Sequence, residues 1–304
     1  MSPLVLGFLP SIIARKAYLA RTKVQTALEF FYRARHDLND PTVSSFVRSR
    51  SRLLREYDLP DDELAKNEMA ITLVATTNAL SSLFWCVAEI FTDPLVLDMC
   101  RKDIYEAVFG ARTRPPPPGV KFNVTINVKN IEDRCQLLIS CYREAIRLAS
   151  QIVTTRRVIE DTIIIGSEGK RYLLKADTNV MMPAKVVHRD KTVWGDDPDK
   201  FDPIRCMFMD DPADYSMRTI KSSFVPFGGG KHLCPGRHLA LKENLAIMAA
   251  LILGFDLVGL DREKLVMGDS KRGETVKPVP GFEGGEVVIK RRKGWEGVVW
   301  AFEY

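Results

Sequence analysis

The segment of this chain best suited to chemistry is FVPFGGGKHLCPGRHLA, residues 224–240, which contains Cys234. Three consecutive glycines precede the cysteine, and because glycine lacks a Cβ atom, a flat ligand could approach this backbone closely. An apolar segment with helical periodicity follows at residues 239–253, so Cys234 is expected near a helix N-terminus, where backbone N–H groups favour a thiolate. Pro235 suits the first helical position, since its missing N–H costs nothing there. A thiolate presented in this way is a strong ligand for a soft transition metal.

The residues alone leave other interpretations of Cys234 open. It could be a buried structural cysteine beside a glycine-rich turn, because short motifs also match by chance. It could share a zinc ion with His232 and His238, although a zinc site needs a fourth ligand and the sequence offers none at a matching spacing. The best-known use of a thiolate in such a loop is as the axial ligand of a heme iron.

The pattern FGxGxHxCxG at residues 227–236 resembles the heme-binding loop of the cytochrome P450 family. The family usually has arginine at the position of His232, and the form with three glycines and histidine is similar to a branch rich in fungal enzymes. The resemblance implies a heme cofactor whose iron is bound by Cys234. It also implies that Phe227, Gly228 and Gly236 shape the loop and that His232 contacts a heme propionate.

A second motif lies in residues 135–149, whose periodicity predicts a helix with Glu144 and Arg147 at positions i and i+3 on one face. Most such pairs are surface salt bridges worth about 0–1 kcal/mol. This pair, however, resembles the Glu-x-x-Arg helix of the same family, whose third member is an arginine after a Phe-x-Pro motif. FDPIR at residues 201–205 supplies it as Arg205. The resemblance implies a buried structural cluster of these three residues that fixes the heme-binding loop.

A long helix with a wide apolar stripe is expected over about residues 61–92. The small and polar residues ATTNA at 75–79 either bend it or serve a function, since Thr and Asn compete for backbone hydrogen bonds. In the family a helix crosses the heme here and carries an acid and a threonine that help deliver protons to bound oxygen. Counting back from Phe84, Thr77 takes the place of the acid and Asn78 that of the threonine. The resemblance makes these two residues the catalytic candidates. With asparagine at this position, the chain resembles a branch of the family that includes sterol hydroxylases and prostacyclin synthase-like isomerases.

Residues 151–188 alternate as strands do, with β-rich runs at 162–165, 171–174 and 179–182. Arg156 lies five residues before Asp161, where the family often places an arginine on a heme propionate, and Arg157 is the competing choice. Residues 150–154 would line the substrate pocket, as this segment does in relatives. His188 is interpreted as a satisfied structural histidine.

Other parts of the chain carry less information. Residues 11–58 are expected to be helical, and Asp93 and Pro94 are expected to begin a further helix. Residues 106–134 are predicted to be a loop, with four consecutive prolines in an extended stretch. An irregular connection is expected at 207–217, and short strands and turns at 255–304.

The bulk composition is that of an ordinary globular protein, with 304 residues, 46% of them hydrophobic and 27% charged. The net charge of +5 is mild and does not suggest nucleic-acid binding. Six cysteines without a Cys-x-x-Cys pair suit free thiols in a reducing compartment. Residues 1–14 are apolar but too short to span a bilayer, which needs roughly 20 residues, so we expect them to lead into a helix.

The resemblance covers nearly the whole chain and implies a mainly α fold with a small β region, the cytochrome P450 fold lacking its N-terminal part. It implies a single domain over residues 1–304 and a monomer. The implied reaction inserts one oxygen atom from O₂ into an apolar small molecule of secondary or lipid and sterol metabolism, with electrons from an NADPH-dependent reductase. The alternatives are an oxygen-independent isomerase of a peroxide-like substrate and an inactive, truncated heme-binding remnant. A full-length relative is expected at the cytosolic face of the endoplasmic reticulum membrane, and this chain, which shows no anchor, in the cytoplasm.

Overall fold

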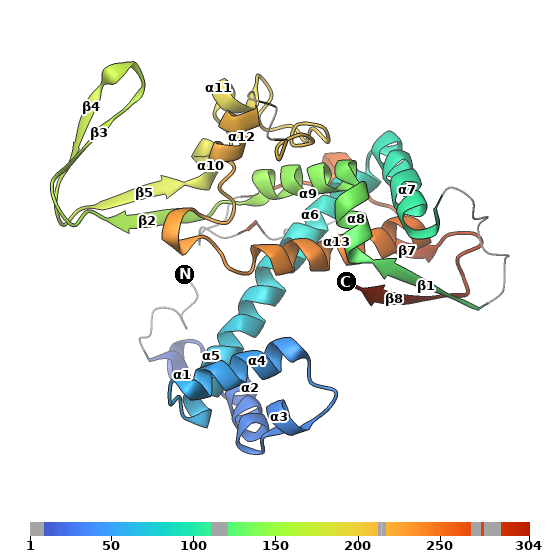
Figure 1. Cartoon of the computed structure of the whole chain (residues 1–304), viewed down its shortest axis with the longest axis horizontal. Coiled ribbons are helices and arrows are strands. Elements are labelled where there is room, and N and C mark those ends of the chain that lie inside the picture. Colours follow the sequence, from blue (N-terminus) through green and yellow to red (C-terminus); the bar gives the residue numbers. More distant parts are fainter. Residues whose placement is uncertain (1–8, 111–120, 212–213, 215–216, 269–274, 277–286) are drawn as a thin grey trace. The chain divides into compact units, whose positions relative to one another are not determined.

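The computed structural model describes residues 9–110, 121–211, 214, 217–268, 275–276 and 287–304 (Figure 1). These residues are mainly helical with a small β part, which confirms the predicted fold class. They divide into two compact units, Met1–Asn78 and Ala79–Tyr304. The prediction of a single domain stays a prediction.

The described part of the first unit is helical, as predicted. Its elements are α1 (Pro10–Ile13), α2 (Arg15–Arg33), α3 (His36–Asn39), α4 (Ser45–Glu56) and α5 (Asp61–Val74). Three acidic residues occupy the first turn of α5, where the helix dipole favours negative charge. Tyr32 of α2 packs with Leu64 and Ala65 of α5 in a small buried cluster that holds the unit together.

A π-helical segment, Ala75–Ala79, follows α5 and leads into α6 (Leu80–Phe91). The boundary between the two units falls inside this segment. The hydroxyls of Thr76 and Thr77 donate to the carbonyls of Thr72 and Leu73, one turn earlier, each across 2.8 Å. Such back-bonding distorts helices, and π-helical turns recur at functional sites. In the described part of the chain, one helical run, Asp61–Phe91, is long and apolar enough to cross a membrane, a property that it shares with core helices of soluble proteins.

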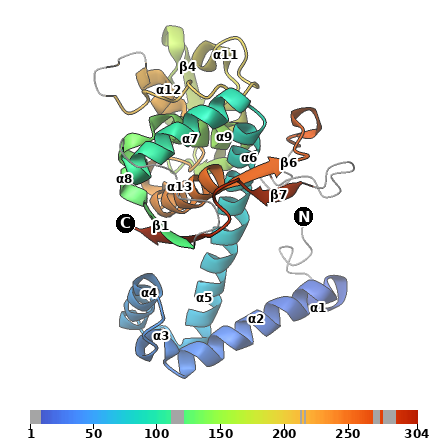
Figure 2. The same cartoon turned by 90° about the vertical axis from the view of Figure 1, so that its right-hand side faces the viewer.

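The second unit has a helical core and several short helices. Its further helices are α7 (Pro94–Phe109), α8 (Val128–Arg134), α9 (Gln136–Ala149), α10 (Ala184–Val187), α11 (Lys191–Trp194), α12 (Met217–Ser223) and α13 (Arg237–Gly254). The start of α7 is as predicted, because the Asp93 carboxylate accepts from the N–H groups of Leu95 and Val96 and Pro94 follows it. α9 packs against α6, while α13 contacts α6, α7 and α8 (Figure 2).

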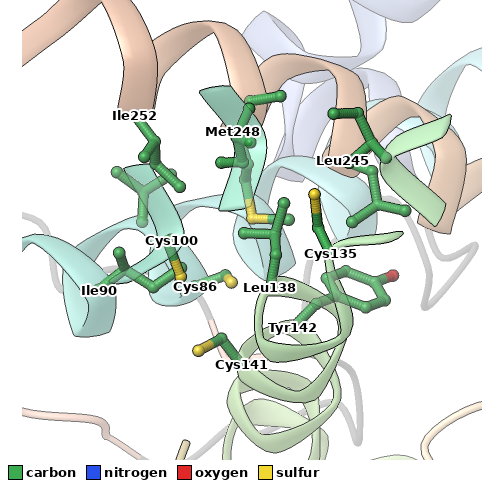
Figure 3. Close-up of a cluster of buried hydrophobic side chains, with 14 of the residues drawn as sticks. Cys86, Ile90, Cys100, Cys135, Leu138, Cys141, Tyr142, Leu245, Met248 and Ile252 are labelled. Atoms are coloured by element: carbon green, nitrogen blue, oxygen red, sulfur yellow. The ribbon is translucent and has the colours of Figure 1, made fainter. Parts of the chain in front are cut away.

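Buried side chains of α6, α7, α9 and α13 meet in the main core (Figure 3). Leu138 of α9 and Met248 of α13 are each at most 1% exposed. Burial of one such side chain stabilises the fold by about 1.5–3 kcal/mol. Cys86, Cys100 and Cys141 also lie in this core as free thiols, in agreement with the prediction from cysteine spacing.

The strands form four two-stranded sheets. The pairs are β1 (Phe122–Asn127) with β8 (Val298–Glu303), β2 (Val153–Arg157) with β5 (Asn179–Pro183), β3 (Thr162–Ile165) with β4 (Arg171–Leu174), and β6 (Phe255–Val258) with β7 (Val288–Arg291). The first pair is parallel and the others are antiparallel. The three β-rich runs predicted within residues 151–188 are β3, β4 and β5.

The prediction of a loop over residues 106–134 was wrong. This segment contains the end of α7, all of β1 and all of α8, while residues 111–120, with the proline run, lie outside the described residues. β1 pairs with β8 in the register Phe122 to Val298, so the two strands are separated by most of the sequence of the second unit. Local periodicity cannot reveal such a distant parallel partner, because pairing over long sequence separations is set by the tertiary fold.

Candidate cofactor site

The glycine-rich loop before Cys234 is held by its own backbone. Gly228 has φ 76° and Gly230 has φ 63°, a left-handed conformation that glycine adopts without strain. The N–H of Gly228 donates to the Val225 carbonyl across 3.1 Å, and the N–H of Cys234 donates to the Phe227 carbonyl across 3.0 Å. These bonds fold the loop back so that its first and last residues are joined.

Cys234 lies just before α13 and is partly exposed, whereas the other five cysteines are buried. The helix begins at Arg237 with Gly236 as its N-cap, so the prediction that Pro235 is the first helical residue was wrong. The reason is local, since Pro235 and Gly236 form a turn and the Gly236 carbonyl accepts the first helical hydrogen bond, from Ala240. A Cβ atom on Gly236 would lie 3.8 Å from the Cys234 Sγ, an ordinary contact, so space alone does not require glycine there.

Strand β2 and the end of α9 contact this loop. Arg156 Nη2 donates to the Gly229 carbonyl across 2.7 Å, and Ser150 Oγ donates to the Pro226 carbonyl across 3.3 Å. Arg157, the competing candidate, instead pairs with Asp177 across 2.9 Å on an exposed surface. Of the two arginines, the structure therefore places Arg156 at the loop.

His232, the other candidate propionate contact, is exposed in the 3₁₀ turn Gly230–His232. A Cβ atom on Gly228 would meet Thr154 Oγ1 at 3.5 Å, so strand β2 approaches the loop closely at this glycine. Phe227 is half-buried and packs against the main core. The cofactor-binding roles of these residues stay predictions.

Glu144 is the centre of a buried polar cluster. Its carboxylate accepts from Arg147 Nε across 2.8 Å and Nη2 across 2.7 Å, and from Arg205 Nε across 3.0 Å. Glu144 and Arg147 are both 0% exposed. The backbone N–H of Asp202 and the thiol of Cys206 also approach the carboxylate, at 3.3 and 3.9 Å. The structure therefore brings together the three residues that the sequence analysis grouped.

The two arginines of this cluster have further partners. Arg147 lies over the Trp194 ring, 4.8 Å from its centroid, and donates to the His188 carbonyl. Arg205 donates to the Trp194 carbonyl. Such complete hydrogen bonding is what a buried ion pair needs, because the cost of removing charges from water can exceed their mutual attraction. The arrangement fits a structural role, because the guanidinium groups of both arginines are hydrogen-bonded within the protein.

His188 is 0% exposed, and both of its ring nitrogens are hydrogen-bonded, as expected for a structural histidine. Its Nδ1 lies 3.0 Å from the Arg147 carbonyl oxygen, and its Nε2 lies 3.0 Å from the backbone nitrogen of Val225. Burial, followed by the nearby charge of Arg147, lowers the pKa of His188 to about 3. No spacing signal in the sequence points to the bond with Val225, because the two residues are 37 positions apart.

Thr77 and Asn78, the catalytic candidates, lie in the π-helical segment Ala75–Ala79, at the boundary between the two units. Their catalytic roles stay predictions. A π-helical segment at this point is a local irregularity of the kind often found at functional sites.

The residues at the loop fit a heme better than a bare metal ion. In the part of the chain that the structure describes, no group of three or more His, Cys, Asp or Glu side chains could hold a metal ion, so the zinc interpretation of His232 and His238 fails. One partly exposed thiol suits a metal that brings its other ligands with it, as a porphyrin does. The cationic Arg156 beside the loop suits the carboxylates of such a group.

Comparisons with known proteins agree with this site. The family model described as Cytochrome P450 matches residues 1–282. The chain is 34% identical over 291 residues to a cytochrome P450 monooxygenase of Gibberella zeae, covering 93% of this chain and 53% of that protein. It is 31% identical over 260 residues to cytochrome P450 monooxygenase nodJ of Hypoxylon pulicicidum, covering 84% and 48%. A 25-hydroxycholesterol 7-alpha-hydroxylase of Rattus norvegicus is 24% identical over 235 residues, covering 75% and 55%. The chain thus spans about half the length of these relatives.

Proposed function

Because this chain belongs to the cytochrome P450 family, we propose that it is the heme-binding part of a monooxygenase that inserts one oxygen atom from O₂ into an apolar small molecule. The observation that carries the proposal is the partly exposed Cys234 at the end of a loop that contacts both Arg156 and Ser150, at the end of the Glu144 helix. When bound, heme supplies the oxygen chemistry, and a thiolate ligand favours O–O cleavage.

The residues of this chain would bind and orient that group. Cys234 would hold the iron, and the glycine backbone at 228–230 would let the ring approach. Arg156 and His232 would bind the propionates by charge-assisted hydrogen bonds. Glu144 and its two arginines would hold the loop in place without touching the substrate.

The proposed partners are an apolar small-molecule substrate and an NADPH-dependent reductase. The names of the two fungal relatives support the monooxygenase reaction, and the name of the rat relative supports a lipid substrate. A membrane location at the cytosolic face of the endoplasmic reticulum belongs to the same proposal. The apolar run Asp61–Phe91 is compatible with it but is weak support.

A second candidate is an isomerase that acts on a peroxide-like substrate without O₂. Asn78 in place of the expected threonine motivates it. A relative of Arabidopsis thaliana that is 27% identical over 191 residues is named an indoleacetaldoxime dehydratase. The relatives of this chain therefore include a protein whose name describes a reaction other than oxygen insertion.

The decisive experiment is the spectrum of the heme-loaded chain, reduced under carbon monoxide, followed by turnover assays. A Soret band at the thiolate position is expected, and Cys234→Ser should lose it. Turnover that needs NADPH, the reductase and O₂ supports the monooxygenase. A chain that binds no heme would instead support an inactive remnant, and a thiolate band retained in the Cys234→Ser variant would show that another residue is the ligand.

A further inference from the structure

We propose that His188 is a positioning residue for the Cys234 loop. Its imidazole joins the last turn of α9, which carries Arg147, to Val225 at the start of the loop. This inference rests on the proposed function, because it assigns to His188 the task of holding the iron ligand. The histidine would act through the loop and would not itself touch heme or substrate.

The hydrogen bonds of His188 define one tautomer. A carbonyl oxygen can only accept, so Nδ1 donates its proton to the Arg147 carbonyl across 3.0 Å. A backbone N–H can only donate, so Nε2 accepts from Val225 across 3.0 Å. The ring is therefore neutral and uses both nitrogens. A residue that served only to fill space would need neither bond.

The contact between Arg147 and His188 runs in both directions. The His188 ring donates to the Arg147 backbone, while the Arg147 side chain donates to the His188 carbonyl. Arg189 adds a bond from its Nη2 to the Leu148 carbonyl across 3.1 Å. These hydrogen bonds fix the segment that carries His188 to the end of α9 and so hold its ring in position.

Aromatic contacts fix the ring itself. Phe224 stacks on it with ring centroids 6.1 Å apart, and Trp194 meets it edge-on at 5.9 Å. Trp194 is also the ring over which Arg147 lies. Phe224 directly precedes Val225, so His188 contacts both a side chain and a backbone amide at the start of the loop.

A short path of hydrogen bonds leads from His188 to the candidate ligand. Val225 donates to the histidine and accepts, through its carbonyl, from Gly228. Phe227, between these two residues, accepts from the N–H of Cys234 through its carbonyl. A shift of Val225 would therefore move the backbone that holds Cys234. Through His188, the buried Glu144 cluster can control where the thiol lies.

Two substitutions separate the two bonds. In His188→Asn the side-chain amide nitrogen can take the position of Nδ1 and keep the bond to Arg147, but it leaves Val225 without an acceptor. In His188→Gln the amide oxygen reaches the position of Nε2 and can keep the bond to Val225. Ile139→Val is the matched control, because Ile139 is a buried residue of α9, 5% exposed and two helical turns before Arg147, so its truncation loosens the core while both hydrogen bonds of His188 stay in place.

The test measures hydrogen exchange of the Val225 amide in the heme-free chain and the thiolate fraction of the reduced carbon monoxide spectrum after heme loading. We expect His188→Asn to speed Val225 exchange by about fivefold or more, the effect of losing one hydrogen bond, and to lower the thiolate fraction. His188→Gln should retain more of both properties, and Ile139→Val should match the unaltered chain.

Unchanged Val225 exchange in His188→Asn would overturn the proposal, as would an unchanged thiolate fraction or equal changes in Ile139→Val. If His188→Asn does not fold, the comparison of His188→Gln with Ile139→Val carries the test. A chain that gives no thiolate spectrum without any substitution refutes the proposed function instead. The exchange of Val225 would still report whether His188 holds the loop.

Discussion

Arg156 donates to the carbonyl oxygen of Gly229 across 2.7 Å, while its neighbour Arg157 pairs with Asp177 on an exposed surface. Both arginines belong to β2, and successive side chains of a strand point to opposite faces. One arginine therefore faces the candidate heme loop and the other faces solvent. This relationship favours Arg156 over Arg157 as the propionate contact, which stays a prediction.

The first prediction is that Arg156→Ala weakens heme binding whereas Arg157→Ala does not. A hydrogen bond to a charged group contributes about 1.5–3 kcal/mol, so the dissociation constant for heme should rise by about tenfold or more in Arg156→Ala. Heme titration followed by the Soret absorbance measures it. Equal affinities for the two variants would show that Arg156 does not contact a propionate.

The second prediction concerns the Glu144 cluster. Glu144→Ala leaves Arg147 buried without its main partner and should lower the free energy of unfolding by roughly 3–5 kcal/mol. Asp133→Ala breaks an exposed pair with Lys129, which solvent screens, and should leave the free energy of unfolding almost unchanged. Urea unfolding measures both. Normal stability and heme content in Glu144→Ala would contradict the structural role.

The third prediction is that an alkylating reagent modifies Cys234 first in the native, heme-free chain. The thiolate is the reactive form, and burial raises the pKa of Cys135 and Cys206 to about 12. The other three buried thiols are shielded from the reagent as well. Peptide mass spectrometry after brief treatment should find one modified cysteine, and all six after unfolding. Bound heme should protect Cys234, and rapid modification of a second thiol would argue against the packing described above.

The sequence predicted those parts of the site that depend on residue type and short spacing. Glu144 and Arg147 share a face because they are three residues apart in a helix, and the runs that form β3 and β4 are rich in residues that favour strands. It could not predict that Val225 donates to His188, 37 residues away, because that contact depends on how the chain folds back. The pairing of β1 with β8 was missed for the same reason.

The fourth prediction is a stability change in acid. The pKa of His188 is lowered to about 3 by burial, then by the charge of Arg147, with a smaller effect from Arg189, whereas an unfolded histidine has a pKa near 6.5. Between these values the unfolded chain binds a proton that the folded chain excludes, so this part of the stability is complete above about pH 6.5 and is lost as the pH falls toward 3. The loss is about 1.4 kcal/mol per pH unit.

Urea unfolding of the unaltered chain and of His188→Gln at several values between pH 7 and 4 measures this effect. The stability of the variant should depend less on pH, because glutamine does not titrate. The difference between the two proteins should therefore shrink as the pH falls. Parallel pH profiles would contradict the buried, neutral state of His188, whatever its effect on the loop.

The last prediction separates the oxygenase from the isomerase through Asn78. The hydroxyls of Thr76 and Thr77 each donate to a carbonyl one turn earlier, so the proton of each hydroxyl is used within the helix. The Asn78 amide can donate and accept hydrogen bonds, and we propose that it would orient a water molecule for proton transfer when heme is bound. General acid–base groups typically contribute about 10²–10⁴-fold to a rate.

In a chain extended to the length of its relatives, Asn78→Ala should therefore slow product formation by about 10²-fold while NADPH is still consumed, because two electrons and two protons would then convert O₂ to hydrogen peroxide instead of supporting oxygen insertion. Thr76→Ala is the control and should couple NADPH use to product as the unaltered chain does. The assay compares NADPH consumed with product formed. Rapid turnover of a peroxide substrate in the absence of NADPH and O₂, insensitive to Asn78→Ala, would decide for the isomerase, because that reaction needs no proton relay to oxygen.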